Sequence, residues 1–332
     1  MLEFYEESCH PLGKYYMFNF SFKEYIIFYL MKFRDVLFKL HMTYRFDNYN
    51  CVVANNADEI KLFNKENKKY SDYCQKFNKK VQNSQKKSGI KSGYCSCCNQ
   101  KVNFRWKLIP KLSENILFPE TYICPKCLMY SRVRAIIHVF KILDSKPLNK
   151  TIYCYEQTTD FFDNIKDLYN DNNEVIGSEY FGADKIPGTY IDGIRHENAM
   201  DLSFSENSID YMISNDVFEH VPNIDAALQE AKRCLKKDGK LIFHVPFNID
   251  LEKTIRRAEI KDEKIVHYEK EEYHGGFSFE NEKGCLAFYN FGCDIFDIMK
   301  KAGFSKTYAV AIQDKKFFNI SIEPIVVFVC EK

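Results

Sequence analysis

From Ser131 onward, short apolar segments alternate with longer amphipathic ones, and this alternation restricts the possible folds more than any other feature of the sequence. Apolar runs of strand length occur four times, in TIYCY, NEVIGSEYF, IDYMIS and KLIFHVPF. Apolar residues recur at helical spacing in three segments around them, RVRAIIHVFKIL, DFFDNIKDLY and NIDAALQEAKRCLKK. Strands separated by helices of this length predict a parallel, doubly wound α/β sheet.

The end of the chain continues this pattern. A helix is predicted for CDIFDIMKKAGF, where Gly303 stands at the position that a left-handed helix terminus favours. Two closing strands are predicted for KTYAVAI and IEPIVVFVCE. We therefore expect residues 131–332 to form one α/β domain.

A cysteine cluster precedes this domain. Two pairs with C-x2-C spacing, Cys95 with Cys98 and Cys124 with Cys127, are separated by 25 residues. Each pair can place two thiolates on one tight turn, and two such turns suit tetrahedral zinc. The sequence predicts a structural zinc ribbon over residues 91–130. Cys97 could replace Cys98 as a ligand, and unpaired buried cysteines are the alternative.

Residues 1–90 are predicted to be a helical, lysine-rich N-terminal extension. Its end, residues 78–93, lacks apolar periodicity and is expected to be a linker or a solvated arm. Charged residues interrupt the most apolar stretch, residues 24–40, so we expect an amphipathic helix there and no membrane span. The sequence begins without a secretory signal pattern, and cysteines grouped for metal fit the cytoplasm.

The first turn of the α/β domain, YEQTTDFF, contains no glycine. Glu156 closes the first strand and Glu179 closes the second, 23 residues later. An acid at that place binds ribose hydroxyls in dinucleotide folds, whereas a missing glycine cradle suggests a cofactor without phosphate. S-adenosylmethionine (SAM) fits, because it combines an adenosine with a sulfonium cation.

One long segment resembles a known family. HENAMDLSFSENSIDYMISNDVFEHVPNIDAALQEAKRCLKKDGKLIFHVPF is similar to class I SAM-dependent methyltransferases of the type called methyltransferase type 11. CPKCLMYSRVRA resembles the zinc ribbon and arginine-containing helix start fused to some of these enzymes, and the resemblance covers about residues 94–330. It implies a Rossmann-like methyltransferase sheet with SAM at its edge.

The resemblance also implies cofactor-binding positions. Glu179 corresponds to the ribose-binding acid, and Asp201 and Leu202 correspond to the pair beside the adenine. Without glycines, the methionine part of SAM would lie against side chains of the first loop. Glu156 could alternatively be an acid favoured by a helix dipole, and Asp201 could cap a turn. The expected cofactor-binding residues are Glu156, Gln157, Glu179, Asp201, Leu202, Asn215 and Asp216.

Methyl transfer from SAM mainly requires alignment, but an oxygen or nitrogen acceptor must also lose a proton. His220 and His274 are the candidate bases, because both are expected near the sheet edge. A purely structural role is the alternative for each, and Glu219 beside His220 could cap a helix. His244 lies inside an apolar strand and is expected to be a core histidine.

The predicted function is SAM-dependent methyl transfer to a small-molecule or saccharide-type acceptor, bound mainly by the insert 249–289. A zinc-ribbon RNA methyltransferase is one alternative, since ten lysines lie between Lys61 and Lys91. A methyltransferase-like interaction module without activity is another. The net charge of +1 favours neither nucleic acid nor membrane as a partner. A dinucleotide-dependent dehydrogenase is disfavoured, because nothing would cradle a pyrophosphate.

Overall fold

The computed structural model describes residues 50–83, 88–107, 120, 122–275, 283–315 and 321–332. All of them belong to the unit Thr43–Lys332. The amphipathic helix expected over residues 24–40 lies outside the described residues. No helix in the described ranges is long and apolar enough to cross a bilayer.

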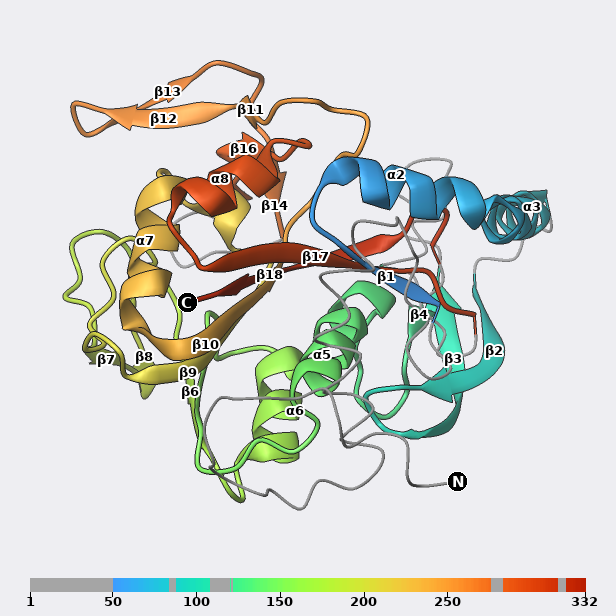
Figure 1. Cartoon of the computed structure of the whole chain (residues 1–332), viewed down its shortest axis with the longest axis horizontal. Helices are drawn as coiled ribbons and strands as arrows, with labels where there is room; N and C mark the ends of the chain where they lie inside the picture. The colour runs from blue at the N-terminus through green and yellow to red at the C-terminus, as the bar shows by residue number, and fades with distance from the viewer. Residues whose placement is uncertain (1–49, 84–87, 108–119, 121, 276–282, 316–320) are drawn as a thin grey trace, which may run out of the picture. The chain divides into compact units, whose positions relative to one another are not determined.

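A seven-stranded sheet forms the centre of this unit, in the order β1-β17-β18-β10-β9-β5-β6 (Figure 1). The strands are β1 (Cys51–Ala54), β5 (Thr151–Cys154), β6 (Glu174–Gly177), β9 (Ile209–Asn215), β10 (Leu235–His244), β17 (Lys306–Ile312) and β18 (Ile325–Glu331). β6, β5, β9 and β10 are parallel, as predicted. β18 is antiparallel to both neighbours, and β1 is antiparallel to β17.

The strands that alternate with helices are parallel, as predicted, whereas the closing strands make the complete sheet mixed. Parallel neighbours need a crossover of a dozen or more residues, usually a helix. The connection from Ile312 to Ile325 is at the lower limit for such a crossover, so the chain returns antiparallel. The α/β class itself is confirmed.

Helices cover both faces of the sheet, which makes it doubly wound (Figure 1). The helices are α2 (Ala57–Glu66), α3 (Lys68–Asn83), α5 (Ser131–Leu143), α6 (Asp160–Tyr169), α7 (Ile224–Cys234) and α8 (Ile295–Lys301). One core lies under α2, α7 and α8, and the other under α5 and α6. Side chains of β10 alternate between them: Leu241 and Phe243 enter the first, Ile242 the second.

Local signals set several helix ends. The Thr159 side chain accepts a hydrogen bond from the backbone N–H of Phe162 and caps α6, and Asn223 caps α7 in the same way. α8 ends at Lys301 with Ala302 as its C-cap, and Gly303 follows with φ of +83°, as predicted for a left-handed terminus.

The cysteine pairs lie on a small antiparallel sheet of β2 (Ser88–Cys95), β3 (Gln100–Lys107) and β4 (Tyr122–Ile123). Gly89 pairs with Trp106, and a Cβ at Gly89 would lie 2.6 Å from the indole ring. The linker expected over residues 78–93 is wrong in part, because α3 continues to Asn83 and β2 begins at Ser88.

The boundaries expected at residues 90 and 130 remain predictions. Part of the expected N-terminal extension nevertheless joins the main sheet, since β1 pairs with β17 and α2 packs its apolar face on the same core. β1 is only four residues long, too short for its apolar pattern to stand out among the polar helices around it.

The insert after β10 consists of hairpins and bridges beyond the carboxyl ends of the sheet. They pair as β11 (Ile255–Arg256) with β16 (Tyr289–Asn290), β12 (Ala258–Lys261) with β13 (Lys264–His267), and β14 (Tyr273–His274) with β15 (Cys285–Leu286). A short hairpin of β7 (Tyr190–Ile191) and β8 (Ile194–Arg195) follows β6, and a 3-10 turn, η2 (Phe218–His220), follows β9.

Candidate active site

The carboxyl ends of β5, β6, β9 and β10 meet at one edge of the sheet, where open α/β sheets bind ligands. Glu156 follows β5, Glu179 follows β6, Asp216 follows β9, and His244 ends β10. Charges on Glu179 and Asp216 both act on Glu156, so the three carboxyl groups lie within electrostatic range of one another. We call this edge the acidic rim.

The acid on β6 holds the glycine-free loop in place. Glu179 Oε1 accepts hydrogen bonds from the backbone N–H of Gln157 at 2.9 Å, from the N–H of Thr158 at 2.8 Å and from its hydroxyl at 2.7 Å. The Gln157 side chain is engaged elsewhere, with Gly193 and Arg195. Glu179 Oε2 has no hydrogen-bond partner among the described residues, so this oxygen is available to a ligand.

Glu156 is buried, with 7% of its surface exposed. Its Oε2 accepts a hydrogen bond of 2.5 Å from the Thr159 hydroxyl, whereas its Oε1 is buried without a partner in the described part of the chain. Burial raises the pKa of Glu156 to about 8, against the opposing effect of Thr159. An orphaned carboxylate oxygen at this edge fits a cationic group such as the ammonium of SAM.

Close packing surrounds Glu156. A Cβ on Gly177 would lie 2.6 Å from the Phe162 ring and 2.8 Å from the carbonyl oxygen of Glu156. Only glycine lets β6 approach the first loop this closely. The glycine that this site requires therefore stands at the end of the second strand and not in the first turn.

Arg132, in the first turn of α5, joins the rim to the cysteine-containing sheet. It forms an ion pair with Asp216, donates a 2.8 Å hydrogen bond to Asn215 Oδ1 and a 3.0 Å bond to Glu120. The sequence analysis did not predict that Arg132 contacts the rim, although the sequence contains an indication of it. α5 has arginines and no acid in its first turn, opposite to the preference of the helix dipole.

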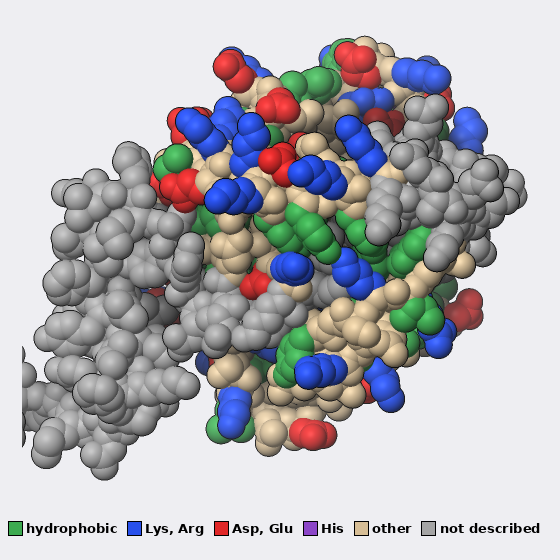
Figure 2. Space-filling model, turned by 90° about the vertical axis from the view of Figure 1, so that its right-hand side faces the viewer, with side chains coloured by type: hydrophobic (Ala, Val, Ile, Leu, Met, Phe, Trp, Pro, Cys, Tyr) green, Lys and Arg blue, Asp and Glu red, His purple; other side chains and the backbone are tan. Residues whose placement is uncertain are grey.

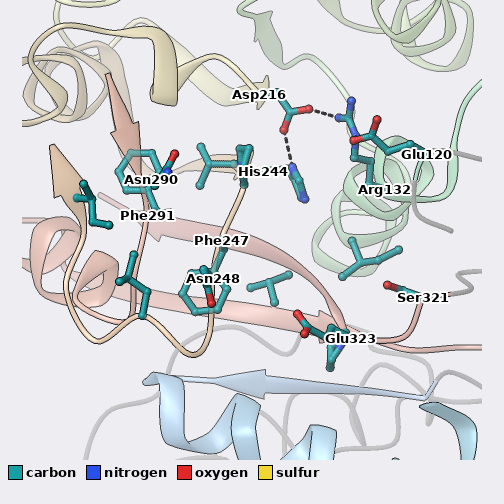
Figure 3. A pocket seen from close by; sticks show the side chains of 17 residues that line it. Glu120, Arg132, Asp216, His244, Phe247, Asn248, Asn290, Phe291, Ser321 and Glu323 are labelled. Atoms are coloured by element: carbon teal, nitrogen blue, oxygen red, sulfur yellow. Dashed lines mark hydrogen bonds and ion pairs between the residues drawn. The ribbon is translucent and has the colours of Figure 1, made fainter. Parts of the chain in front are cut away.

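His244 Nδ1 lies 2.6 Å from Asp216 Oδ1 (Figure 3). Burial alone would raise the pKa of Asp216, but the charges of His244 and Arg132 outweigh it and lower the pKa. Asp216 also has φ of +52°, which is uncommon for a residue with a side chain and concentrates at functional sites. The interpretation of His244 as a core histidine is wrong, because it ends its strand at the wall of a cavity.

This cavity has a volume of about 490 Å³ and lies beside the Arg132–Asp216–His244 network (Figure 3). Its walls combine aromatic, amide and carboxylate groups. The lining includes Glu120, Phe247, Asn248, Asn290, Phe291 and Glu323. Burial raises the pKa of Glu323, with a smaller effect from Asp250. The insert 249–289 supplies only part of the lining, and the start of β18 supplies another part that the sequence analysis missed.

The two predicted histidine bases lie side by side, with ring centroids 5.0 Å apart. His220 Nε2 is 3.7 Å and His274 Nδ1 is 3.8 Å from the same oxygen, Oε1 of Glu219. Glu219 is fully buried, and its carboxylate has no hydrogen-bond partner in the described residues. The Glu219 carboxylate raises the pKa of His274 to about 9.

Asp201 and Leu202, expected beside the adenine, lie in a turn against α7. The backbone N–H of Leu202 donates to Glu230 Oε2 at 3.0 Å, and its carbonyl accepts from Arg233 at 2.7 Å. Leu202 is buried and Asp201 is exposed. These contacts fix the backbone of the pair and leave the Asp201 carboxylate at the surface.

The four cysteines of the two C-x2-C pairs converge, with all sulfurs within 4.8 Å of one another. The Cys95–Cys127 and Cys98–Cys124 sulfur distances are both 3.8 Å. A tetrahedron with zinc–sulfur bonds of 2.3 Å has edges of about 3.8 Å, so the donor set fits zinc. Cys97 is not in this group.

The surroundings of the four sulfurs suit an anionic metal centre. Backbone N–H groups of Cys98 and Lys126 donate to Cys95 and Cys124 sulfurs at 3.5 and 3.4 Å. Arg134 is fully buried nearby. Its burial lowers the pKa of the guanidinium, and the charges of the cysteines oppose this effect. A fixed cation therefore stands beside the thiolates.

Residues 144–243 match the sequence family described as a methyltransferase domain. A demethylmenaquinone methyltransferase from Bacillus cereus (strain ATCC 10987 / NRS 248) is 26% identical over 110 residues, which are 31% of this chain and 46% of that protein. The corresponding protein from Bacillus cytotoxicus is 27% identical over the same shares. The chain thus spans about half the length of the curated relatives it matches.

Among solved structures, a 1,6-didemethyltoxoflavin-N1-methyltransferase from Burkholderia thailandensis is 10% identical, with a TM-score of 0.36. The match covers 60% of this chain and 78% of that one. The family match spans β5, β6, β9 and most of β10, the strands whose ends build the acidic rim. Residues 144–243 of this chain therefore match a methyltransferase domain.

Proposed function

We propose that the protein transfers a methyl group from SAM to a small-molecule or saccharide-type acceptor. The observation that carries this proposal is the acidic rim, in which Glu156 and Glu179 each offer an oxygen without a partner in the described chain. The rim lies within the strands that match a methyltransferase domain, and a cavity large enough for a small molecule adjoins it.

In this proposal the chain's own acids hold SAM, which supplies an activated methyl group. Glu179 Oε2 accepts from a ribose hydroxyl, while Oε1 keeps the first loop in place. Glu156 receives the ammonium of the methionine part. The backbone of Gln157 and the pair Asp201–Leu202 shape the pocket between these two ends, and Asn215 and Asp216 border it at β9. Binding and alignment by such groups provide most of the catalysis.

The acceptor is assigned to the cavity. Asn248, Asn290 and Glu323 offer hydrogen-bonding groups, and Phe247 and Phe291 offer apolar surface. This combination suits a molecule with several hydroxyl or amino groups on a compact ring, as in saccharides. Loss of the acceptor proton is assigned to the cluster formed by His220, His274 and Glu219, in which the two imidazole rings lie 5.0 Å apart.

Two measurements test this function. Calorimetry of the purified protein with SAM should give saturable binding at one site, and a scaffold without activity should give no heat. Incubation of the protein with methyl-labelled SAM and a lysate of its source cell should then label a small molecule. Label found in RNA instead would support the RNA methyltransferase, and binding without any labelled product would oppose the enzyme.

RNA remains the second candidate acceptor because of the lysines of α3 and the cysteine-containing sheet. Figure 2 shows that the described cations on this face are mixed with acids and apolar side chains. RNA-binding surfaces usually carry clustered cations with exposed aromatic groups. The mixed face favours the small-molecule acceptor.

We also propose that Cys95, Cys98, Cys124 and Cys127 bind one structural zinc. The sulfur spacing, the N–H groups directed at two sulfurs and the buried Arg134 support this assignment. A site of four thiolates has no open position, so its zinc stabilises the small sheet and takes no part in catalysis.

A further inference from the structure

We propose that Glu219, His220 and His274 form a second metal site, which binds a divalent transition cation such as Zn²⁺. One ligand atom from each residue lies within 4.8 Å of the others. Two imidazoles and a carboxylate are the donors that Zn²⁺ and neighbouring first-row cations accept. This site is separate from the four cysteines and differs from them in chemistry.

Glu219 provides the first argument. Its side chain is fully buried, yet neither carboxylate oxygen has a hydrogen-bond partner among the described residues. The two imidazole nitrogens lie 3.7 and 3.8 Å from Oε1, too far for hydrogen bonds and close enough to share a cation between them. A buried carboxylate without hydrogen bonds is costly, and a cation bound between it and the two imidazoles would reduce this cost.

The outer nitrogens of both histidines provide the second argument. His220 Nδ1 lies 2.8 Å from the carbonyl oxygen of Leu286, which can only accept, so Nδ1 carries the proton and Nε2 has its lone pair available. His274 Nε2 lies 2.9 Å from Glu272 Oε1, which leaves Nδ1 to face Glu219. Metal-binding histidines are typically oriented by a carbonyl or a carboxylate in this way.

The fold holds these three residues from two separate segments. Glu219 and His220 lie in η2 after β9, and the N–H of Phe288 donates to the Glu219 carbonyl at 2.7 Å. His274 lies in β14, where its neighbour Tyr273 pairs with Leu286. The ligands are therefore brought together by the hairpin of the insert and not by local sequence spacing.

A site with three protein ligands has an open coordination position, as catalytic zinc sites do. η2, which carries Glu219 and His220, begins two residues after Asp216 at the cavity wall, so the cation would lie near the acceptor. There it would acidify an acceptor hydroxyl, with His220 and His274 as ligands and not as free bases. The sulfur–methyl bond breaks, the oxygen–methyl bond forms, and the hydroxyl proton goes to water. This role rests on the proposed function, but the metal site does not.

Zinc binding to the full-length reduced protein tests the site directly. After treatment with a chelator, the protein is titrated with Zn²⁺ against a chromophoric zinc indicator. Wild type should bind two equivalents, whereas His220→Ala and His274→Ala should each bind one. His267→Ala is the matched control, because His267 forms a similar exposed pair with Glu271, and it should bind two. One equivalent in wild type, or two in both alanine variants, would overturn the proposal.

Two further measurements separate the possible causes. The charge-transfer absorption of Co²⁺ bound to the thiolates should persist in His220→Ala, which shows that the variant is folded and that the lost equivalent is not at the cysteines. Glu272→Gln should weaken the second equivalent by about 10- to 100-fold, whereas Glu271→Gln should not. If wild type binds two zinc ions but no SAM, the metal site stands and the proposed function fails.

Discussion

Replacing Glu156 with glutamine tests the acidic rim most directly. Burial raises the pKa of Glu156 from 4.5 to about 8, so the folded protein keeps a proton that the unfolded chain loses in this range. The stabilisation is complete below pH 4.5 and disappears as the pH rises to 8. At 1.36 kcal/mol per pKa unit, the loss is at most about 5 kcal/mol. Glu156→Gln cannot ionise and should not show this loss.

The assay is chemical unfolding at pH 5.5 and pH 9 for both proteins. The wild type should lose stability relative to Glu156→Gln between these two values, by about 3 kcal/mol, because part of the total loss already occurs below pH 5.5. Groups that titrate in both proteins cancel in this comparison. Parallel pH profiles for the two proteins would refute the assignment of a raised pKa to Glu156.

SAM binding provides the second half of the same test. If the SAM ammonium pairs with Glu156, binding at pH 7 must ionise a group that is mostly protonated beforehand, and about 0.9 proton should be released. Calorimetry in buffers of different ionisation enthalpy measures this number. Glu156→Gln should bind SAM more weakly and release no proton from this position. Wild-type binding without proton release would exclude the contact with the ammonium.

Three other outcomes are expected. Glu179→Ala should weaken SAM binding by about 1.5–3 kcal/mol in calorimetry, and unchanged affinity would remove the ribose assignment. Cys124→Ser should retain one zinc fewer by elemental analysis and should lower the free energy of unfolding by at least about 2 kcal/mol. Cys97→Ser is the control and should show neither change, so equal zinc content in the two variants would count against the zinc ribbon. Gly177→Ala should destabilise the protein by about 1–3 kcal/mol and weaken SAM binding, because its Cβ meets Phe162 and the Glu156 carbonyl; wild-type stability would show that the loop can move aside.

The periodicity of the sequence was sufficient for the α/β class, for most strands and helices of the methyltransferase domain and for the end of α8 at Gly303. It could not show that β18 would run antiparallel between β10 and β17, because strand order depends on long-range packing. β1 was not predicted for the same reason. Four apolar residues are too few to indicate a strand until their pairing with β17 is known.

The site was predictable to a smaller extent. Spacing identified the cysteine pairs, and strand ends identified the acids of the rim. The burial of Glu219 and the ion pair between Arg132 and Asp216 both depend on residues that are distant in sequence. No local sequence pattern predicts either feature. The interpretation of His244 as a core residue rested on the apolar residues beside it in β10. His244 is the last residue of that strand, and the sequence did not show that the strand ends there.

Arg132 and Arg134 lie two residues apart in the first turn of α5, and their side chains contact different parts of the protein. Arg134 donates to the carbonyls of Met129 and Tyr122 beside the cysteines, while Arg132 contacts Asp216. If the proposed zinc is bound at the four cysteines, an oxidant that expels it should therefore also shift the start of α5 and weaken the ion pair between Arg132 and Asp216. If the protein transfers methyl groups as proposed, this activity should then fall on oxidation of the four cysteines, although they lie outside the acidic rim.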